Sequence, residues 1–242
     1  MGKIFAVTSG KGGVGKSTFS TCLAYSFAKG QQRTVLIDLD EGLRCLDIML
    51  GADSKIVFDL GDAVGDMDIS KALYKIDNEQ NLFFIPAPDR KGKIGDKLGE
   101  FVERLSKDFD VVILDFPAGI QNEIYSVLPD KTQFLTVAVP DNISIRDAAA
   151  VNGALKELHK ISLLIINRFD IKKMRKGIYR NIDDMIDLSG LRLVGIVPES
   201  DELALLSLKH RIKKRGKASR AFIRIAARLS GKRLSLPKFK KI

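Results

Sequence analysis

The strongest constraint on the fold of this chain is a glycine-rich loop near its N-terminus. Residues 10–17 read Gly-Lys-Gly-Gly-Val-Gly-Lys-Ser and match the phosphate-binding P-loop pattern. In such a loop the glycines let backbone N–H groups turn inward around a polyphosphate, Lys16 reaches the β- and γ-phosphates, and the Ser17 hydroxyl binds Mg²⁺. The motif needs a strand before it and a helix after it, and residues 4–7 and 20–28 suit these two roles. The predicted contacts to the nucleotide from this motif are Gly10, Lys11, Gly12, Gly13, Val14, Gly15, Lys16, Ser17 and Thr18.

Lys11 is an addition that an ordinary P-loop does not require. It stands at the front edge of the loop, five residues before Lys16. A second lysine at this place suits a protein whose loop meets another nucleotide across a dimer interface.

Composition places the chain among globular intracellular proteins. Its 242 residues are enough for one α/β domain, and 45% of them are hydrophobic, which supports a sizeable core. No apolar run is long enough to span a membrane, and there is no signal segment at the start. The two cysteines, Cys22 and Cys45, are too few for a disulfide framework. We therefore expect a reduced, cytoplasmic protein.

Short apolar runs alternate with helical stretches along the chain. Continuous apolar runs are typical of strands covered on both faces, and the intervening stretches are long enough for crossover helices. The pattern predicts a single doubly wound, mostly parallel α/β sheet with helices on both faces, and a nucleotide at the carboxyl ends of its strands. The predicted strands are residues 4–7, 34–37, 82–85, 111–114, 134–139, 162–166 and 191–197, and examples of the predicted helices are 92–107, 143–159 and 177–188.

Three aspartates follow predicted strands. Asp38 and Asp40 end the second strand, and Asp115 ends the fourth. Parallel strands share an end, so these carboxylates should lie at the same rim as the P-loop, where Mg²⁺ prefers carboxylate and water oxygens. Asp115 fits the role of holding the metal through water. Asp38 and Asp40 lie on opposite sides of the chain, so at most one of them can point at the γ-phosphate and position the attacking water.

The net charge of +10 is distributed very unevenly. Residues 207–242 hold 14 Lys/Arg and no Asp or Glu, whereas residues 1–206 hold 26 Lys/Arg against 30 Asp/Glu. Such asymmetry predicts a polyanionic partner, either membrane headgroups or nucleic acid. The simpler interpretation of the same asymmetry is a solvated basic tail that aids solubility. Residues 209–217 and the last nine residues form two basic clusters.

Taken together, these motifs resemble the MinD/ParA family of ATPases, which carry a deviant Walker A motif. The matches lie in order and span most of residues 1–206: residues 11–18 (KGGVGKST), 38–47 (DLDEGLRCLD), 115–119 (DFPAG), 144–147 (SIRD) and 194–199 (VGIVPE). The resemblance implies ATP and Mg²⁺ as cofactors and a cycle between a monomer and an ATP-bound homodimer. It also implies slow hydrolysis that another protein activates, and a spatial regulator of division-site placement.

The resemblance also implies roles for individual residues. Lys11 would reach the phosphates of the partner subunit, while Asp40 positions water with Asp38 in support. The metal would be held by Ser17, Asp38 and Asp115. The residues on the adenine side would be Asn167, Arg168, Pro198 and Glu199; an Asn amide can present a donor and an acceptor to the base, although Asn also favours turns.

The C-terminus departs from the MinD-type members of this family, which carry a separate amphipathic membrane-binding helix. We predict an ATPase domain over residues 1–231, whose last helix (218–229) carries Arg220, Arg224 and Arg228 as a stripe, and a short basic tail over 232–242. Pro237 interrupts the tail, which is too short for a stable helix alone. Its Lys238, Lys240 and Lys241, beside Phe239 and Ile242, still suit an anionic membrane surface and a peripheral location on the inner face of the cell membrane.

Two other functions are consistent with the same sequence. A ParA-like partition or positioning ATPase would bind DNA, which the basic end and Lys172, Lys173, Arg175 and Lys176 favour. A nucleotide-sensing adaptor would bind ATP and hardly hydrolyse it.

Overall fold

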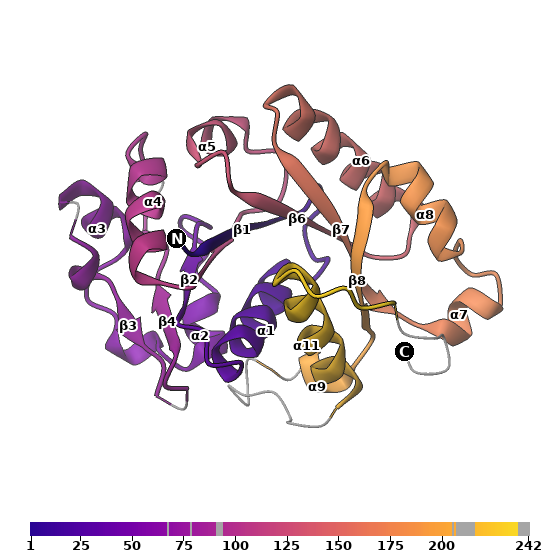
Figure 1. The fold of residues 1–242 in the computed structure, drawn as a ribbon, viewed down its shortest axis with the longest axis horizontal. Coiled ribbons are helices and arrows are strands. Elements are labelled where there is room, and N and C mark those ends of the chain that lie inside the picture. The colour runs from indigo at the N-terminus through magenta and orange to yellow at the C-terminus, as the bar shows by residue number, and fades with distance from the viewer. Residues whose placement is uncertain (67, 78, 91–93, 205, 207–215, 237–242) are drawn as a thin grey trace.

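The computed structural model consists of one eight-stranded sheet with helices on both faces (Figure 1). It describes residues 1–66, 68–77, 79–90, 94–204, 206 and 216–236. The strand order is β3-β4-β2-β5-β1-β6-β7-β8. The strands are β1 (Lys3–Thr8), β2 (Thr34–Asp38), β3 (Tyr74–Lys75), β4 (Leu82–Ile85), β5 (Val111–Asp115), β6 (Gln133–Ala138), β7 (Ile161–Phe169) and β8 (Arg192–Pro198).

The sheet confirms the predicted fold class. Each of the seven predicted strands is present, and these seven pair in parallel. Most positions of the four central strands β2, β5, β1 and β6 are buried, which explains their unbroken apolar runs. The strand that the sequence did not predict, β3, is two residues long and pairs antiparallel with β4 at the edge of the sheet. So short a strand leaves no periodicity to detect.

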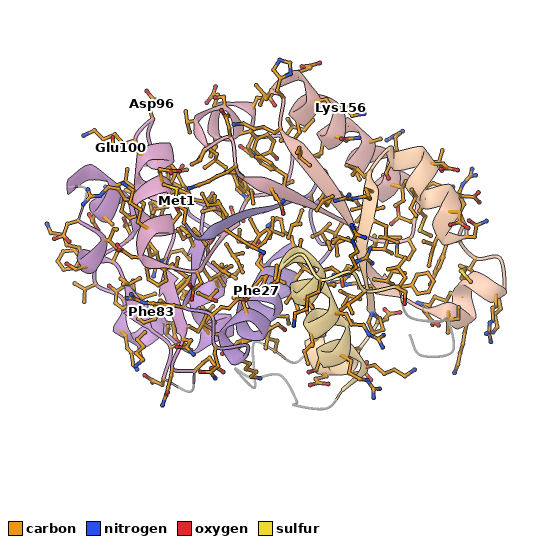
Figure 2. The ribbon with its side chains drawn as sticks, in the orientation of Figure 1. Met1, Phe27, Phe83, Asp96, Glu100 and Lys156 are labelled. Carbon is orange, nitrogen blue, oxygen red and sulfur yellow. The ribbon has the colours of Figure 1, made fainter. Side chains whose placement is uncertain are left out.

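Helices cover the two faces in two groups. The helices are α1 (Lys16–Lys29), α2 (Leu46–Leu50), α3 (Leu60–Asp66), α4 (Leu98–Asp108), α5 (Asn122–Val127), α6 (Asn142–Glu157), α7 (Ile171–Arg175), α8 (Ile182–Ser189), α9 (Asp201–Ala204) and α11 (Lys217–Leu229). Buried residues of α1, α2 and α11 form one core cluster with the sheet, while α3, α4, α5, α6 and α8 pack on the other face. Charged side chains such as Asp96, Glu100 and Lys156 lie on the outside, whereas Phe27 points into the interior (Figure 2).

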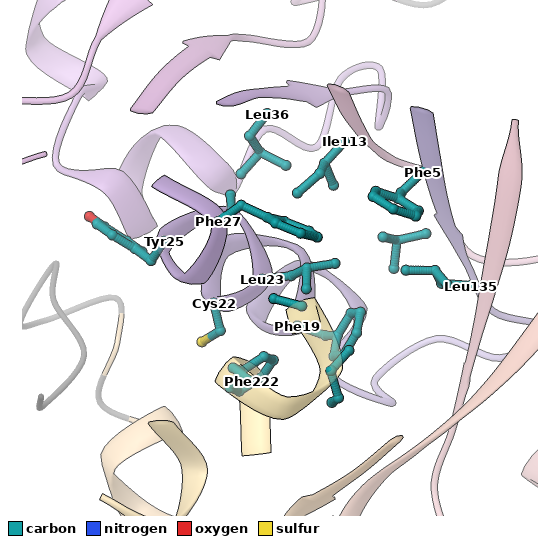
Figure 3. Packing of buried hydrophobic residues seen from close by; sticks show 14 of the residues in the cluster. Phe5, Phe19, Cys22, Leu23, Tyr25, Phe27, Leu36, Ile113, Leu135 and Phe222 are labelled. Carbon is teal, nitrogen blue, oxygen red and sulfur yellow. The ribbon is translucent and has the colours of Figure 1, made fainter. Parts of the chain in front are cut away.

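Aromatic rings join α1 to both of its neighbours. Phe27 of α1 stacks on Phe5 of β1 with the ring centroids 5.6 Å apart, and Phe19 meets Phe222 of α11 at 5.5 Å (Figure 3). Such ring pairs contribute about 0.5–1.5 kcal/mol each beyond the burial of their area. The helix that follows the P-loop is therefore held from the sheet side and from the C-terminal helix.

Two of the predicted helices have different limits in the structure. The segment predicted as a helix over 177–188 begins only at Ile182, because Gly177 adopts a left-handed φ of 69° and Asn181 caps α8 by accepting a hydrogen bond from the Asp184 N–H. The helix predicted from residue 92 begins at Leu98 in the described part of the chain. Helix α6 follows its prediction closely, because the Asp141 carboxylate accepts from the Ser144 N–H at its start.

Within the described residues, no helix is both long and apolar enough to cross a membrane. Both basic clusters, residues 209–217 and the tail, fall largely outside the described residues. The division into a domain over 1–231 and a tail over 232–242 stays a prediction.

Candidate functional site

The P-loop connects β1 to α1 at the carboxyl end of β1. Gly13 and Gly15 adopt φ values of 77° and 85°, in the left-handed region that favours glycine, and Gly15 is the N-cap of α1. A Cβ added at Gly13 would meet no atom within 4 Å, so the backbone conformation, not crowding, is what demands glycine there. The loop thus leads into the positive end of the α1 dipole, an arrangement suited to an anion.

The end of β7 holds the P-loop from the side. Asn167 is 5% exposed, and its Nδ2 donates to the backbone oxygen of Val14 at 2.8 Å. A Cβ on Gly15 would lie 2.6 Å from that same Nδ2 and 3.7 Å from Nε of Arg168. Gly15 is therefore required by packing as well as by its φ. The predicted contact of Asn167 and Arg168 with adenine stays a prediction, but both residues lie at the P-loop.

Pro198 and Glu199 lie beside this point. Phe169 is in register with Pro198, and the Glu199 N–H donates to the Phe169 carbonyl at 3.0 Å. Lys173 of α7 donates to the Glu199 carboxylate at 2.9 Å. The residues predicted for the adenine side thus come together where β7 and β8 end.

Lys16 points inward, toward the carboxylate at the end of β5. It is 8% exposed, and its Nζ lies 3.5 Å from Oδ1 of Asp115, which is fully buried. The Ser20 hydroxyl donates to the same carboxylate oxygen at 2.7 Å. Ser20 was not predicted as a site residue; the signal for it is a polar side chain one helical turn after Ser17, on the buried side of α1.

Asp38 and Asp115 form a buried carboxylate pair. They are opposite each other in the β2–β5 register, and both are 0% exposed. Oδ2 of each makes no hydrogen bond with the described residues. Two buried carboxylate oxygens without a donor, next to the P-loop lysine and Ser17, suit a divalent cation that prefers oxygen ligands. The residues at this rim therefore fit Mg²⁺.

Asp40 differs from Asp38 in its environment. Its side chain is half-buried, whereas Asp38 is buried, and its backbone N–H donates to Oδ1 of Asp38 at 2.9 Å. The two carboxylates therefore occupy the interior and the rim of the site. Which of them positions water stays a prediction.

Cys45, which precedes α2, lies against the same rim. Burial raises the pKa of its thiol to about 11, and a hydrogen bond with the Ser17 side chain opposes that rise. Cys22 is fully buried in α1, and its burial raises the pKa of its thiol too. Both cysteines are thus held in the protonated form near neutral pH.

Lys11 differs from Lys16 in its exposure. Its side chain is exposed, and within the described residues it makes no ion pair. The loop beneath it is fixed, because the Ser9 hydroxyl donates to the Lys11 carbonyl at 2.9 Å and a Cβ on Gly10 would lie 2.6 Å from the Asp147 carbonyl oxygen. The loop thus presents one cation inward and one outward.

The buried carboxylate pair leads to a prediction on pH. Burial, and then the charge of Asp115, raise the pKa of Asp38 from 3.8 to about 7. The folded state therefore binds the proton of the Asp38 carboxyl group more tightly than the unfolded state does. The stabilisation of the fold by this proton is lost as pH rises from about 4 through 7. Without nucleotide or metal, we expect the free energy of unfolding of the wild type to fall relative to Asp38→Asn by on the order of 3 kcal/mol between pH 5 and pH 8. Urea denaturation of both proteins at several pH values measures this, and parallel curves would contradict it.

A parallel sheet with a P-loop after its first strand, a buried lysine and carboxylates at the next strand ends defines a P-loop nucleoside triphosphatase. Residues 5–212 match the CobQ/CobB/MinD/ParA nucleotide binding domain. The chain belongs to this MinD/ParA family, as the sequence predicted.

Individual relatives agree with this assignment. The chain is 35% identical over 215 residues to a septum site-determining protein MinD of Synechocystis sp., covering 86% of this chain and 80% of the relative. It is 32% identical to that of Bacillus subtilis, covering 98% and 92% of the two chains. Among solved structures, a MinC:MinD cell division protein complex of Aquifex aeolicus superimposes with a TM-score of 0.88 at 31% identity and 98% coverage of both chains.

These comparisons confirm the main function prediction over its two alternatives: the chain is a septum-site-determining ATPase of the MinD/ParA family. Its nucleotide-binding domain, together with the P-loop and the two buried carboxylates at the same rim, supports ATP and Mg²⁺ as cofactors. Structures of ParA-like proteins also share the fold, for example one from Chlorobium tepidum with a TM-score of 0.78, but at only 20% identity.

Proposed function

We propose that the chain cycles between a monomer and an ATP-bound homodimer that closes over the P-loop edge of the sheet. The observation that carries this proposal is the opposite placement of its two P-loop lysines. Lys16 is buried against Asp115, while Lys11 is exposed and unpaired in the described part of the chain. An outward cation on a rigid phosphate loop suits the phosphates of a second copy's nucleotide.

Exposed apolar side chains surround the same edge and support a protein partner there. Leu43 follows β2 and is 72% exposed, Ile120 follows β5 and is 44% exposed, and Ile143 follows β6 and is 55% exposed. Because these strands are parallel, the three residues lie at the carboxyl end of the sheet together with Lys11. A dimer would remove this apolar surface from water.

Within each copy we assign the following roles. The backbone of residues 10–18 and the Lys16 ammonium bind the phosphates. Ser17, Asp38 and Asp115 would hold Mg²⁺, which would offset the negative charge of the phosphates. Asp40 orients the attacking water, with Asp38 in support through the hydrogen bond from the Asp40 N–H. The base lies toward Asn167, Arg168, Pro198 and Glu199.

We further propose that a second protein triggers hydrolysis and links the cycle to division-site placement. The Aquifex aeolicus relative occurs in a complex with MinC. A partner of this kind would bind the dimer in preference to the monomer, since only the dimer presents two copies of each surface.

The role of Asp40 can be tested directly. We expect Asp40→Ala to retain ATP binding but to lower turnover about a hundredfold, because the water is no longer oriented. The variant should accumulate as an ATP-bound dimer, which light scattering with ATP and a phosphate-release assay measure together. Asp68→Ala, which removes an exposed carboxylate distant from the P-loop in sequence, is the matched control. Wild-type turnover in Asp40→Ala would move the role to Asp38.

The attachment of the dimer to an anionic membrane is the last part of the proposal. Its predicted device, residues 232–242, extends beyond the described residues from residue 237 onward. Lys238, Lys240 and Lys241 would contribute about 1 kcal/mol each near an anionic surface, a weak and reversible attachment. A dimer carries two such ends, so avidity strengthens attachment without new contacts, and ATP would control it by pairing the chains.

Deletion of residues 235–242 tests this attachment. We expect the truncated protein to lose cosedimentation with anionic liposomes in the presence of ATP, while ATP binding and dimerisation are unchanged. High salt should weaken attachment of the intact protein, because the attraction is electrostatic. Retained attachment after truncation would exclude the tail as the anchor. If the intact protein instead binds DNA with ATP, and loses that binding when Arg220, Arg224 and Arg228 are neutralised, DNA replaces the membrane as the surface to which the dimer attaches.

A further inference from the structure

A cavity lined by basic side chains lies at the edge of the sheet, away from the P-loop. Its volume is about 570 Å³, and it is formed by the start of β8 and the chain that follows α11. Four cationic residues line it, namely Arg192, Arg228, Lys232 and Arg233. Because Arg192 begins β8 and the P-loop follows the carboxyl end of the parallel strand β1, the cavity and the nucleotide site lie at opposite ends of the sheet.

The positive charge of this cavity is not compensated by the described part of the protein. No acidic residue of the described part of the chain lines it, and none of the four cations forms an ion pair with a described carboxylate. Among the described residues, Nη2 of Arg228 makes only a long hydrogen bond of 3.4 Å to the Leu193 carbonyl, and its buried Nη1 makes none. Burial, followed by the charge of Arg192, lowers the pKa of Arg228. An anion in the cavity would relieve this repulsion and supply the missing acceptor.

The cations are carried by a fixed part of the fold. Lys3 of β1 donates through Nζ to the Leu229 carbonyl at 3.0 Å, which ties the last turn of α11 to the sheet. Gly231 then reverses the chain with a φ of 93° and brings Lys232 and Arg233 toward β8. The backbone that carries these cations is therefore held in place before an anion binds, which lowers the entropy cost of binding.

Apolar side chains beside the cavity indicate which anion it suits. Leu234 and Leu236 are 41% and 37% exposed, and Ile161, which begins the neighbouring strand β7, is 64% exposed. Cations next to exposed aliphatic groups are typical of surfaces that lie at a lipid headgroup boundary. A free phosphate ion would gain nothing from the leucines.

We propose that this cavity binds the phosphate of an anionic phospholipid headgroup, with Arg192, Arg228 and Arg233 as its main contacts. Guanidinium groups suit this role because they bind phosphate oxygens in a bidentate manner. The inference rests on the membrane attachment proposed above and adds a site on the folded body to the tail. Two anchors would orient the P-loop edge relative to the membrane, which a single anchor alone does not do.

The test compares two double variants of the full chain. Arg192→Gln/Arg233→Gln removes two exposed cations of the cavity, and Lys172→Gln/Arg175→Gln removes two exposed cations from α7, which follows the carboxyl end of β7. Both change the net charge equally. With ATP and vesicles of phosphatidylglycerol and phosphatidylcholine, we expect the cavity variant to bind about thirtyfold more weakly than the wild type and the α7 variant less than about threefold more weakly. Equal losses of vesicle binding in the two variants would overturn the assignment of the cavity as a lipid site.

A soluble probe separates this inference from membrane attachment in general. Dihexanoyl-phosphatidylglycerol, titrated below its micellar concentration, should shift arginine side-chain NMR signals of the wild type, and these shifts should be lost in Arg228→Gln. Inorganic phosphate at the same concentration should cause no such shifts. Equal shifts with inorganic phosphate would identify a plain phosphate site, and binding of duplex DNA in place of the lipid would identify a nucleic-acid surface; either result overturns the lipid assignment. Shifts with the soluble lipid in a protein that ignores vesicles would overturn the membrane proposal and leave the cavity standing.

Discussion

We expect Lys16→Ala to weaken ATP binding at least about thirtyfold. Lys16 is the one P-loop lysine that is buried, and its Nζ lies within 3.5 Å of Asp115. Loss of one partner from a buried charged pair costs about 2–5 kcal/mol, which corresponds to roughly a thirtyfold to several-thousandfold change in affinity. Calorimetry or fluorescence titration with an ATP analogue measures this directly, and an unchanged affinity would refute the P-loop assignment.

Because Lys16 also neutralises Asp115, the variant needs a control for folding. Removing the lysine leaves a buried carboxylate without its cation, which can lower stability independently of ATP. Lys16→Gln keeps most of the side-chain volume, and Lys29→Ala removes an exposed lysine from the other end of the same helix. A loss of ATP binding in both Lys16 variants, with thermal unfolding still cooperative and Lys29→Ala normal, assigns the effect to the phosphate contact.

Lys11→Ala should have a different and equally large effect. ATP binding to the monomer should stay within about threefold of the wild type, because the Lys11 side chain is exposed and the loop is fixed through the backbone contact of Ser9 and the packing of Gly10. Dimer formation with ATP should be abolished, since the proposed target of Lys11 is the phosphate of the other copy. Turnover, which depends on the dimer, should then fall about a hundredfold or more.

Light scattering with a non-hydrolysable ATP analogue, together with an ATPase assay, tests this separation. Lys107→Ala, which removes an exposed lysine from α4 far from the P-loop edge, should dimerise normally. An ATP-dependent dimer of Lys11→Ala would show that Lys11 has no role across the interface. Lys16→Ala and Lys11→Ala thus separate binding in one copy from pairing of two.

Much of the nucleotide site follows from the order of its segments in the sequence. The P-loop pattern, its flanking strand and helix, and the aspartates that end β2 and β5 are all local features of a few residues. Their meeting at one edge follows from parallel pairing, which continuous apolar runs already indicate. Lys16, Asp38, Asp115 and Asn167 therefore lie at the P-loop edge of the sheet, where the sequence predicted them. Their roles still await the experiments above.

Contacts between distant segments could not be read in this way. Ser20 donates a hydrogen bond to Asp115, 95 residues away in the sequence, and Asn167 donates one to the Val14 carbonyl, 153 residues away. Each depends on which strands become neighbours and on the register between them, and neither leaves a periodic signal. The short edge strand β3 and the start of α8 at Ile182 were missed for a related reason. Two residues, or one glycine with a left-handed φ, change a boundary without changing the hydrophobic pattern.

By itself the sequence determined the fold class, the P-loop and the family, because each rests on local residue types and on the spacing of apolar runs. Only the tertiary structure decided that Lys16 is buried and Lys11 exposed, and that Arg192 and Arg228 line one cavity. It also decided that Asp38 and Asp115 form a buried pair in which one oxygen of each accepts no hydrogen bond from the described residues. The physical reason is that burial and electrostatic coupling depend on distances between atoms, and for residues far apart along the chain those distances exist only after the sheet and its covering helices have packed together.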